Sequence, residues 1–90
     1  MDSLKFSFAG RHALITGGAQ GIGFEISKMF LEAGAQVTMA DYSQEGLETA
    51  RRELSQFKTL ATVRLDVSDR KSCAAMAEGL KSPLHILVNN

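Results

Sequence analysis

The stretch of sequence that decides the fold lies at residues 16–23 and reads TGGAQGIG. It separates an apolar run from a helical pattern, so it predicts a glycine-rich turn between a β-strand and an α-helix. Backbone N–H groups at such a helix N-terminus can bind the negative charge of a pyrophosphate. Gly17 would let the strand turn sharply, Gly21 would let a ligand approach the backbone, and Gly23 would let the helix pack close to the sheet. Ile22, between the last two glycines, is expected to point to the core.

The spacing of these glycines bears on the kind of ligand. It is glycine, three residues, glycine, one residue, glycine, which differs from the G-x-G-x-x-G of most Rossmann dehydrogenases. No Gly-Lys-Ser or Gly-Lys-Thr follows, so a Walker-type phosphate loop is disfavoured. The alternative is that the glycines serve only a plain tight turn. Their position between a strand and a helix favours phosphate binding.

Outward from this turn, four apolar runs alternate with three helical patterns. The expected strands are residues 12–16, 36–41, about 61–67 and 84–88. Strict alternation of apolar strands and helices predicts a parallel sheet with helices packed against it. Right-handed crossovers then place the first two helices on one face, the third on the other, and the strands in the order 3-2-1-4. This is an α/β fold, the first half of a Rossmann-type doubly wound parallel sheet.

The three helical patterns each predict an apolar stripe. The first stripe, ended by Gly34, consists of Ile22, Ile26, Met29, Phe30 and Ala33. The second follows a Ser43 cap and consists of Leu47, Ala50, Leu54 and Phe57. The third follows a cap at Ser68 or Asp69 and consists of Cys73, Met76, Ala77 and Leu80. Serine and aspartate are favoured caps because their oxygens accept hydrogen bonds from the first helical N–H groups.

Length and composition bound the class of protein. Ninety residues, 44% hydrophobic and 22% charged, suit one globular domain. The formal net charge is zero, which removes the electrostatic case for nucleic acid or an anionic membrane as a partner. No apolar run approaches the roughly 20 residues that span a bilayer. The single cysteine, Cys73, fits a reducing compartment, so a cytoplasmic location is expected.

Asp41 ends the second expected strand, eighteen positions after Gly23. An acidic side chain there can accept hydrogen bonds from the ribose hydroxyls of a dinucleotide. A 2′-phosphate would instead meet a like charge, at a cost of roughly 4 kcal/mol per charge pair at an effective dielectric of about 20. No arginine or lysine stands at residues 18–20, 40 or 42–43 to offset it. NAD(H) is therefore expected over NADP(H), the alternative being that Asp41 only caps the next helix.

Four motifs in order resemble the short-chain dehydrogenase/reductase family. They are the glycine turn, Asp41, the triplet Leu65-Asp66-Val67, and Leu87-Val88-Asn89-Asn90, which is similar to the opening of the N-N-A-G motif. The resemblance implies that the Asp66 side chain bonds the adenine amino group. It also implies that the Val67 backbone meets the adenine ring and the Asn90 backbone lies beside the ribose, with Asn89 as a brace between strands. The expected cofactor-binding residues are Gly17, Ala19, Gln20, Gly21, Ile22, Gly23, Asp41, Asp66, Val67 and Asn90.

The catalytic residues of that family are a serine and a Y-x-x-x-K pair that lie downstream of N-N-A-G. The only tyrosine here, Tyr42, is followed four positions later by Gly46, so no residue matches the catalytic motif. Residues 1–90 are expected to be the N-terminal part of one NAD-binding Rossmann domain, inactive without its catalytic half. The resemblance implies an NAD(H)-dependent oxidoreductase that interconverts a secondary alcohol and a ketone. It also implies that the full-length protein is a homo-oligomer. The alternative is a truncated, non-catalytic dinucleotide-binding module. For Asp66, the alternative is that it only begins the turn into the third helix.

Two histidines need separate interpretation. His85, in the fourth expected strand, is interpreted as a hydrogen-bonded structural residue rather than a catalytic one. His12, at the start of the first strand, is expected at the surface. No cluster of histidine, cysteine and aspartate has metal-ligand spacing, so no metal site is expected.

Overall fold

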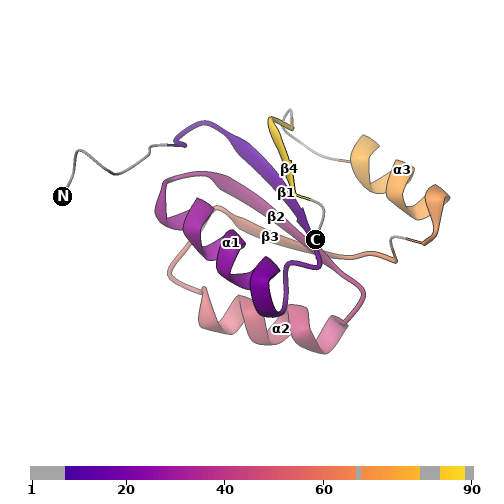
Figure 1. Ribbon diagram of the computed structural model, residues 1–90, viewed down its shortest axis with the longest axis horizontal. Helices are drawn as coiled ribbons and strands as arrows, with labels where there is room; N and C mark the ends of the chain where they lie inside the picture. The colour runs from indigo at the N-terminus through magenta and orange to yellow at the C-terminus, as the bar shows by residue number, and fades with distance from the viewer. Residues whose placement is uncertain (1–7, 67, 80–83, 89–90) are drawn as a thin grey trace.

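The computed structural model describes residues 8–66, 68–79 and 84–88. Strands and helices alternate along the whole described chain (Figure 1). Their bounds are β1 His12–Thr16, α1 Gly21–Glu32, β2 Gln36–Asp41, α2 Gln44–Glu53, β3 Leu60–Arg64, α3 Arg70–Glu78 and β4 Ile86–Val88. The expected bounds of β1 and β2 are confirmed, whereas β3 and β4 are shorter than the apolar runs that predicted them.

The strands form one parallel sheet in the order β3-β2-β1-β4, as expected for the first half of a doubly wound fold. Helices α1 and α2 pack on one face, against β1, β2 and β3. Met76 of α3 packs instead against Leu14, Ala40 and Leu65, which face the other way. Figure 1 shows α3 set apart from the α1–α2 pair. The right-handed crossovers therefore separate the helices as the rule predicts.

The core lies mainly between the sheet and the α1–α2 pair. Alternate residues of the two central strands, including Ile15 and Met39, are fully buried there. Helix α2 presents the predicted stripe, with Leu47, Ala50 and Leu54 each at most 2% exposed. These apolar strands can lie at the centre of the sheet because they are covered on both faces.

Helix α2 also begins as its sequence predicts. Ser43 is the N-cap, and its Oγ accepts a hydrogen bond from the backbone N–H of Gly46 at 3.0 Å. Glu45 lies in the first turn and Arg51 and Arg52 in the last. Both placements oppose the helix dipole with complementary charge.

The predicted apolar face of α1 is only partly correct, because Ile26 and Phe30 pack against the core as expected but Ile22 and Met29 do not. Ile22 is 71% exposed and Met29 66% exposed, while the buried residues are Gly23, Ser27 and Leu31. Successive helical residues are rotated by about 100°, so a glycine at position 23 that faces the sheet turns Ile22 away from it. Small residues on this face allow a close approach that large side chains would prevent. The expected helix end is confirmed, because Gly34 has a φ of +93°.

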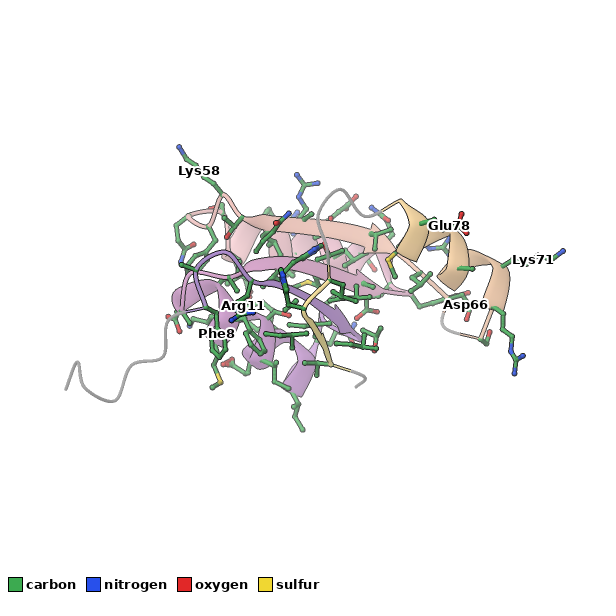
Figure 2. All side chains as sticks on the ribbon, turned by 90° about the horizontal axis from the view of Figure 1, so that it is seen from above. Phe8, Arg11, Lys58, Asp66, Lys71 and Glu78 are labelled. Carbon is green, nitrogen blue, oxygen red and sulfur yellow. The ribbon has the colours of Figure 1, made fainter. Side chains whose placement is uncertain are left out.

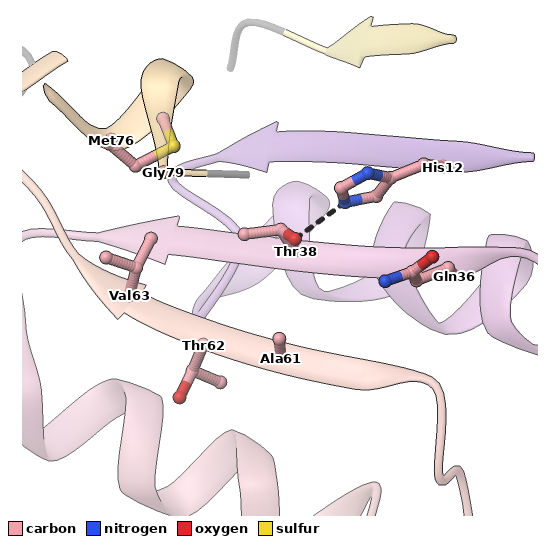
Figure 3. Close-up of a pocket in the computed structure, with 8 residues that line it drawn as sticks. All are labelled: His12, Gln36, Thr38, Ala61, Thr62, Val63, Met76 and Gly79. Carbon is pink, nitrogen blue, oxygen red and sulfur yellow. Dashed lines mark hydrogen bonds between the residues drawn. The ribbon is translucent and has the colours of Figure 1, made fainter. Parts of the chain in front are cut away.

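His12 is buried, at 2% exposed, and not at the surface as expected. Its Nε2 lies 2.7 Å from Thr38 Oγ1, inside the sheet face that carries α3 (Figure 3). The backbone N–H of His12 donates to Nδ1 of His85 at 3.0 Å, and the His85 N–H donates to the His12 carbonyl at 2.9 Å. Hydrogen bonding offsets the desolvation of a buried imidazole. The structural interpretation of His85 agrees with these contacts.

Candidate dinucleotide site at the carboxyl edge of the sheet

The glycine turn joins the end of β1 to the start of α1 in a backbone shape that glycine favours. Gly17 and Gly21 have φ values of +64° and +55°, in the left-handed region that costs other residues free energy. A Cβ built on Gly21 would have nothing within 4 Å. The backbone at Gly21 therefore faces open space, which is the condition for a ligand to approach it closely.

Gly18 has a role that sequence reasoning missed. A Cβ at this position would lie 2.6 Å from Cγ of Met39 and 3.0 Å from the carbonyl oxygen of Ile15. Both atoms belong to the buried centre of the sheet. The Gly18 N–H donates to the carbonyl of Ala40 at 3.2 Å. Gly18 thus fixes the turn against the sheet, and the sequence signal was a second glycine adjoining Gly17.

The N-terminus of α1 carries no side-chain cap. Gln20 occupies the N-cap position without a capping hydrogen bond, and the first turn contains no acidic residue. The first N–H groups of an α-helix have no partner within the helix, and the helix dipole adds partial positive charge there. An anion bound at residues 20–22 would accept hydrogen bonds from these N–H groups and lie at the positive end of the dipole, so the turn fits a pyrophosphate.

Asp41 links the carboxyl end of β2 to this turn. Its Oδ2 accepts a hydrogen bond from the N–H of Ala19 at 3.0 Å, and its Oδ1 accepts one from the N–H of Ser43 at 3.0 Å. Gly46 brings α2 close on the same side, because a Cβ there would lie 3.3 Å from the Ala19 Cβ. Each carboxylate oxygen has a further lone pair. Asp41 can therefore hold the turn and still accept a hydrogen bond from a ligand.

An arginine lies beside Asp41 that sequence reasoning did not consider. Arg64 ends β3 and is the register partner of Asp41 across the parallel β2–β3 pair. Its Nε donates to the Tyr42 carbonyl at 3.1 Å, and its guanidinium carbon lies 5.1 Å from the centre of the Tyr42 ring. Arg64 is far from Asp41 in the sequence, so the residues next to Asp41 do not reveal it. Aligning the expected second and third strands in parallel register could have identified the pair.

Asp66 follows β3 and is exposed. Its Oδ1 accepts hydrogen bonds from the Ser68 hydroxyl at 2.6 Å and the Ser68 N–H at 3.0 Å. These bonds lower the pKa of the Asp66 carboxyl, with a smaller contribution from the charge of Arg64. Figure 2 shows Asp66 at the end of the sheet near the start of α3. Val67 and Asn90, the remaining expected cofactor residues, lie outside the described residues, as does Asn89.

The described candidate residues follow strand ends at one edge. Thr16, Asp41 and Arg64 end β1, β2 and β3, and parallel strands end at the same edge. Ligands of open α/β sheets bind outside the carboxyl ends of the strands. The exposed side chain of Ile22 also points away from the core on the first turn of α1, so its expected inward direction is wrong.

A separate pocket of about 400 Å³ lies across the sheet face that carries α3, away from the glycine turn. Figure 3 shows His12 and Thr38 in it, with Met76 and Gly79 at one end. The expected cofactor residues do not line it. Within the described ranges, no helix is long and apolar enough to cross a membrane. The same ranges contain no group of three or more His, Cys, Asp or Glu residues able to hold a metal ion.

Comparison with known proteins agrees with this geometry. The family model for short chain dehydrogenases matches residues 11–90. The chain is 41% identical over 86 residues to 3beta-hydroxysteroid dehydrogenase 2 of Eggerthella lenta. The aligned part covers 91% of this chain and 33% of the relative. It is 38% identical over 84 residues to D-erythrulose reductase of Gallus gallus, covering 93% and 32%. This chain belongs to the short-chain dehydrogenase family.

Solved structures share the fold. The RhlG/NADP active-site complex of Pseudomonas aeruginosa superimposes with a TM-score of 0.85 at 37% identity, covering 96% of this chain and 36% of that one. A hydroxysteroid dehydrogenase from Escherichia coli gives a TM-score of 0.85 at 32% identity, covering 93% and 37%. The chain therefore spans about a third of the length of the relatives it matches. The family relatives are oxidoreductases that use a Rossmann-type nucleotide-binding fold.

Proposed function

We propose that this chain binds a nicotinamide dinucleotide along the carboxyl edge of its sheet, with NAD(H) preferred over NADP(H). The observation that carries the proposal is the position of Asp41, whose carboxylate is hydrogen-bonded to the glycine turn and lies at the end of β2. One side chain thereby connects the phosphate end and the ribose end of the proposed site. This arrangement suits a ligand that carries both groups.

The pyrophosphate would lie against the turn and the uncapped start of α1. Its proposed contacts are the backbone of Gly17, Ala19, Gln20, Gly21, Ile22 and Gly23. Asp41 would accept hydrogen bonds from the ribose hydroxyls, each contributing about 1.5–3 kcal/mol as a bond to a charged group. Asp66 would accept one from the adenine amino group. Val67 and Asn90 are proposed through the family resemblance alone.

The preference for NAD(H) rests on charge at the ribose. The Asp41 carboxylate would repel a 2′-phosphate and attract ribose hydroxyls. The neighbouring RhlG structure is a complex with NADP, so the 2′-position is where the proposal has to be tested.

A bound nicotinamide would supply hydride transfer, and the chain's own residues would hold the adenosine and pyrophosphate part of the dinucleotide. Relatives are named as a hydroxysteroid dehydrogenase, a 3-oxoacyl reductase and an erythrulose reductase. We propose that the complete enzyme interconverts a secondary alcohol and a ketone of a small molecule. We also propose that the complete enzyme is a homo-oligomer and that it is cytoplasmic. The single cysteine, Cys73, supports the cytoplasmic location, because it fits a reducing compartment.

The testing experiment compares NADH and NADPH affinities of the purified protein and its Asp41→Asn variant by fluorescence titration. We expect NADH binding to weaken about tenfold or more, equivalent to at least about 1.4 kcal/mol, and NADPH binding to weaken less or improve. Glu48→Gln, which removes one negative charge from an exposed position on α2, is the matched control and should change neither affinity. An unchanged NADH affinity in Asp41→Asn would remove Asp41 from the ribose site.

A further inference from the structure

We propose that Arg64 is a specificity-determining residue that reads the 2′-position of the ribose, so that the site also takes NADPH, more weakly than NADH. This rests on the proposed function, because it needs the ribose to lie at Asp41. It differs from that function in assigning a second ligand and a second residue to the same edge. The residues next to Asp41 in the sequence include no arginine or lysine.

Strand geometry places Arg64 on the same face as the Asp41 carboxylate. Val63 and Leu65 pack against the cluster on the α3 face. Alternation along a strand therefore directs the intervening Arg64 to the opposite face. Asp41 bonds the glycine turn on that same opposite face, and the two residues are register partners.

The side chain of Arg64 is held by two contacts. The Nε bond to the Tyr42 carbonyl and the placement over the Tyr42 ring fix the plane of the guanidinium. Within the described part of the chain, Arg64 forms no ion pair with Asp41. A guanidinium has five N–H donors, and Arg64 is exposed, so one bonded Nε leaves four donors on the terminal nitrogens that a ligand could use. Such a fork matches the oxygens of a phosphate.

Charge at this edge explains why the result is a weaker second ligand and not a switch of preference. Asp41 and Asp66 each carry a negative charge near the proposed adenosine, and Arg64 carries one positive charge. The cation offsets part of the repulsion that a 2′-phosphate meets from Asp41. It does not remove the hydrogen bonds that Asp41 offers to an unmodified ribose. NADH therefore remains the tighter ligand.

The test measures NADH and NADPH affinities of the purified protein and of Arg64→Gln. We expect the NADPH affinity to fall about tenfold and the NADH affinity to change by less than about twofold. Arg52→Gln is the matched control, because Arg52 is an exposed arginine on α2 whose Nη2 donates to Thr49 Oγ1 at 3.4 Å. It should alter neither affinity. Raising the ionic strength should reduce the difference in NADPH affinity between the unmodified protein and Arg64→Gln, because salt screens exposed charges.

Each other outcome is decisive. Equal losses for both cofactors, no loss for NADPH, or no measurable NADPH binding by the unmodified protein would each overturn the assignment of Arg64. In those cases NADH binding that still depends on Asp41 leaves the proposed function standing. Failure of both dinucleotides to bind would instead overturn the proposed function. Adenosine 2′,5′-bisphosphate and adenosine 5′-monophosphate, used as short probes, should reproduce the effect without the nicotinamide half.

Discussion

The carboxylate of Asp41 accepts a hydrogen bond from the N–H of Ala19 at 3.0 Å, across twenty-two positions of sequence. This bond ties the end of β2 to the glycine turn after β1. The second oxygen of Asp41 bonds Ser43 at the start of α2. One acidic side chain thus sets the relative positions of a strand end, the glycine turn and a helix N-terminus.

Gly18 gives a prediction about stability. Gly18→Ala places a Cβ 2.6 Å from the Met39 Cγ and 3.0 Å from the Ile15 carbonyl. Overpacking of this kind costs about 1–3 kcal/mol, and we expect a loss in that range in the free energy of unfolding by urea. Gly79→Ala is the control, since its Cβ would lie 3.4 Å from the nearest atom. Equal stabilities of the two variants would show that the turn can move away from the sheet.

Gly21 gives a prediction about binding. Gly21→Val puts a branched side chain into the open space beside the turn and should abolish dinucleotide binding in a calorimetric titration. The φ of +55° also penalises any side chain, by about 1–2 kcal/mol. Gly21→Ala has a similar backbone cost to Gly21→Val but a smaller side chain. It should therefore bind the dinucleotide more tightly than Gly21→Val while having a similar stability. Binding by Gly21→Val as tight as by the unmodified protein would move the pyrophosphate elsewhere.

The buried contact between His12 and Thr38 should contribute measurably to stability. Thr38→Val keeps the side-chain shape and leaves the His12 Nε2 without its hydroxyl neighbour at 2.7 Å. Loss of a buried partner costs about 1–3 kcal/mol. Thermal unfolding should show this loss in Thr38→Val and a smaller one in Thr38→Ser, which retains a hydroxyl. No difference between the two variants would mean that the hydroxyl does not stabilise His12.

Asp66 gives a prediction about pH. Ser68 lowers the pKa of Asp66 from the ordinary value of 3.8 in the folded protein. A depressed pKa means that the contact stabilises the fold above pH 3.8 and that this contribution is lost as the pH falls through the folded-state pKa. Ser68→Ala should raise the Asp66 pKa in an NMR titration of its carboxyl carbon. A pKa unchanged by that substitution would exclude the Ser68 hydroxyl as the main cause, because the backbone N–H of residue 68 remains in the variant.

The parts of the fold that the sequence predicts best are those fixed by continuous burial. β1 and β2 are buried on both faces, so their apolar runs coincide with the strands. β3 pairs with β2 only and lies at an edge of the described sheet. The strand ends at Arg64, before the end of the apolar run that predicted it. The failure at Ile22 has a different cause. Periodicity gives weight to large apolar residues, whereas α1 approaches the sheet through the small residues Gly23 and Ser27.

The candidate site was predictable where a motif is local and not where it depends on strand pairing. Gly17, Gly21 and Asp41 follow from short patterns at the ends of two strands. Arg64 becomes a neighbour of Asp41 only through the β2–β3 register. The buried state of His12 likewise depends on a partner, Thr38, twenty-six positions away.

The central claim is that the adenosine ribose of a nicotinamide dinucleotide lies at Asp41 while the pyrophosphate lies at the glycine turn. The most direct measurement is a crystal structure of the protein with NAD⁺. We predict both ribose hydroxyls within hydrogen-bonding distance of the Asp41 carboxylate, about 2.5–3.0 Å, and phosphate oxygens against the backbone at residues 19–22. A dinucleotide bound in the pocket beside His12 and Thr38, or one whose ribose makes no contact with Asp41, would contradict it.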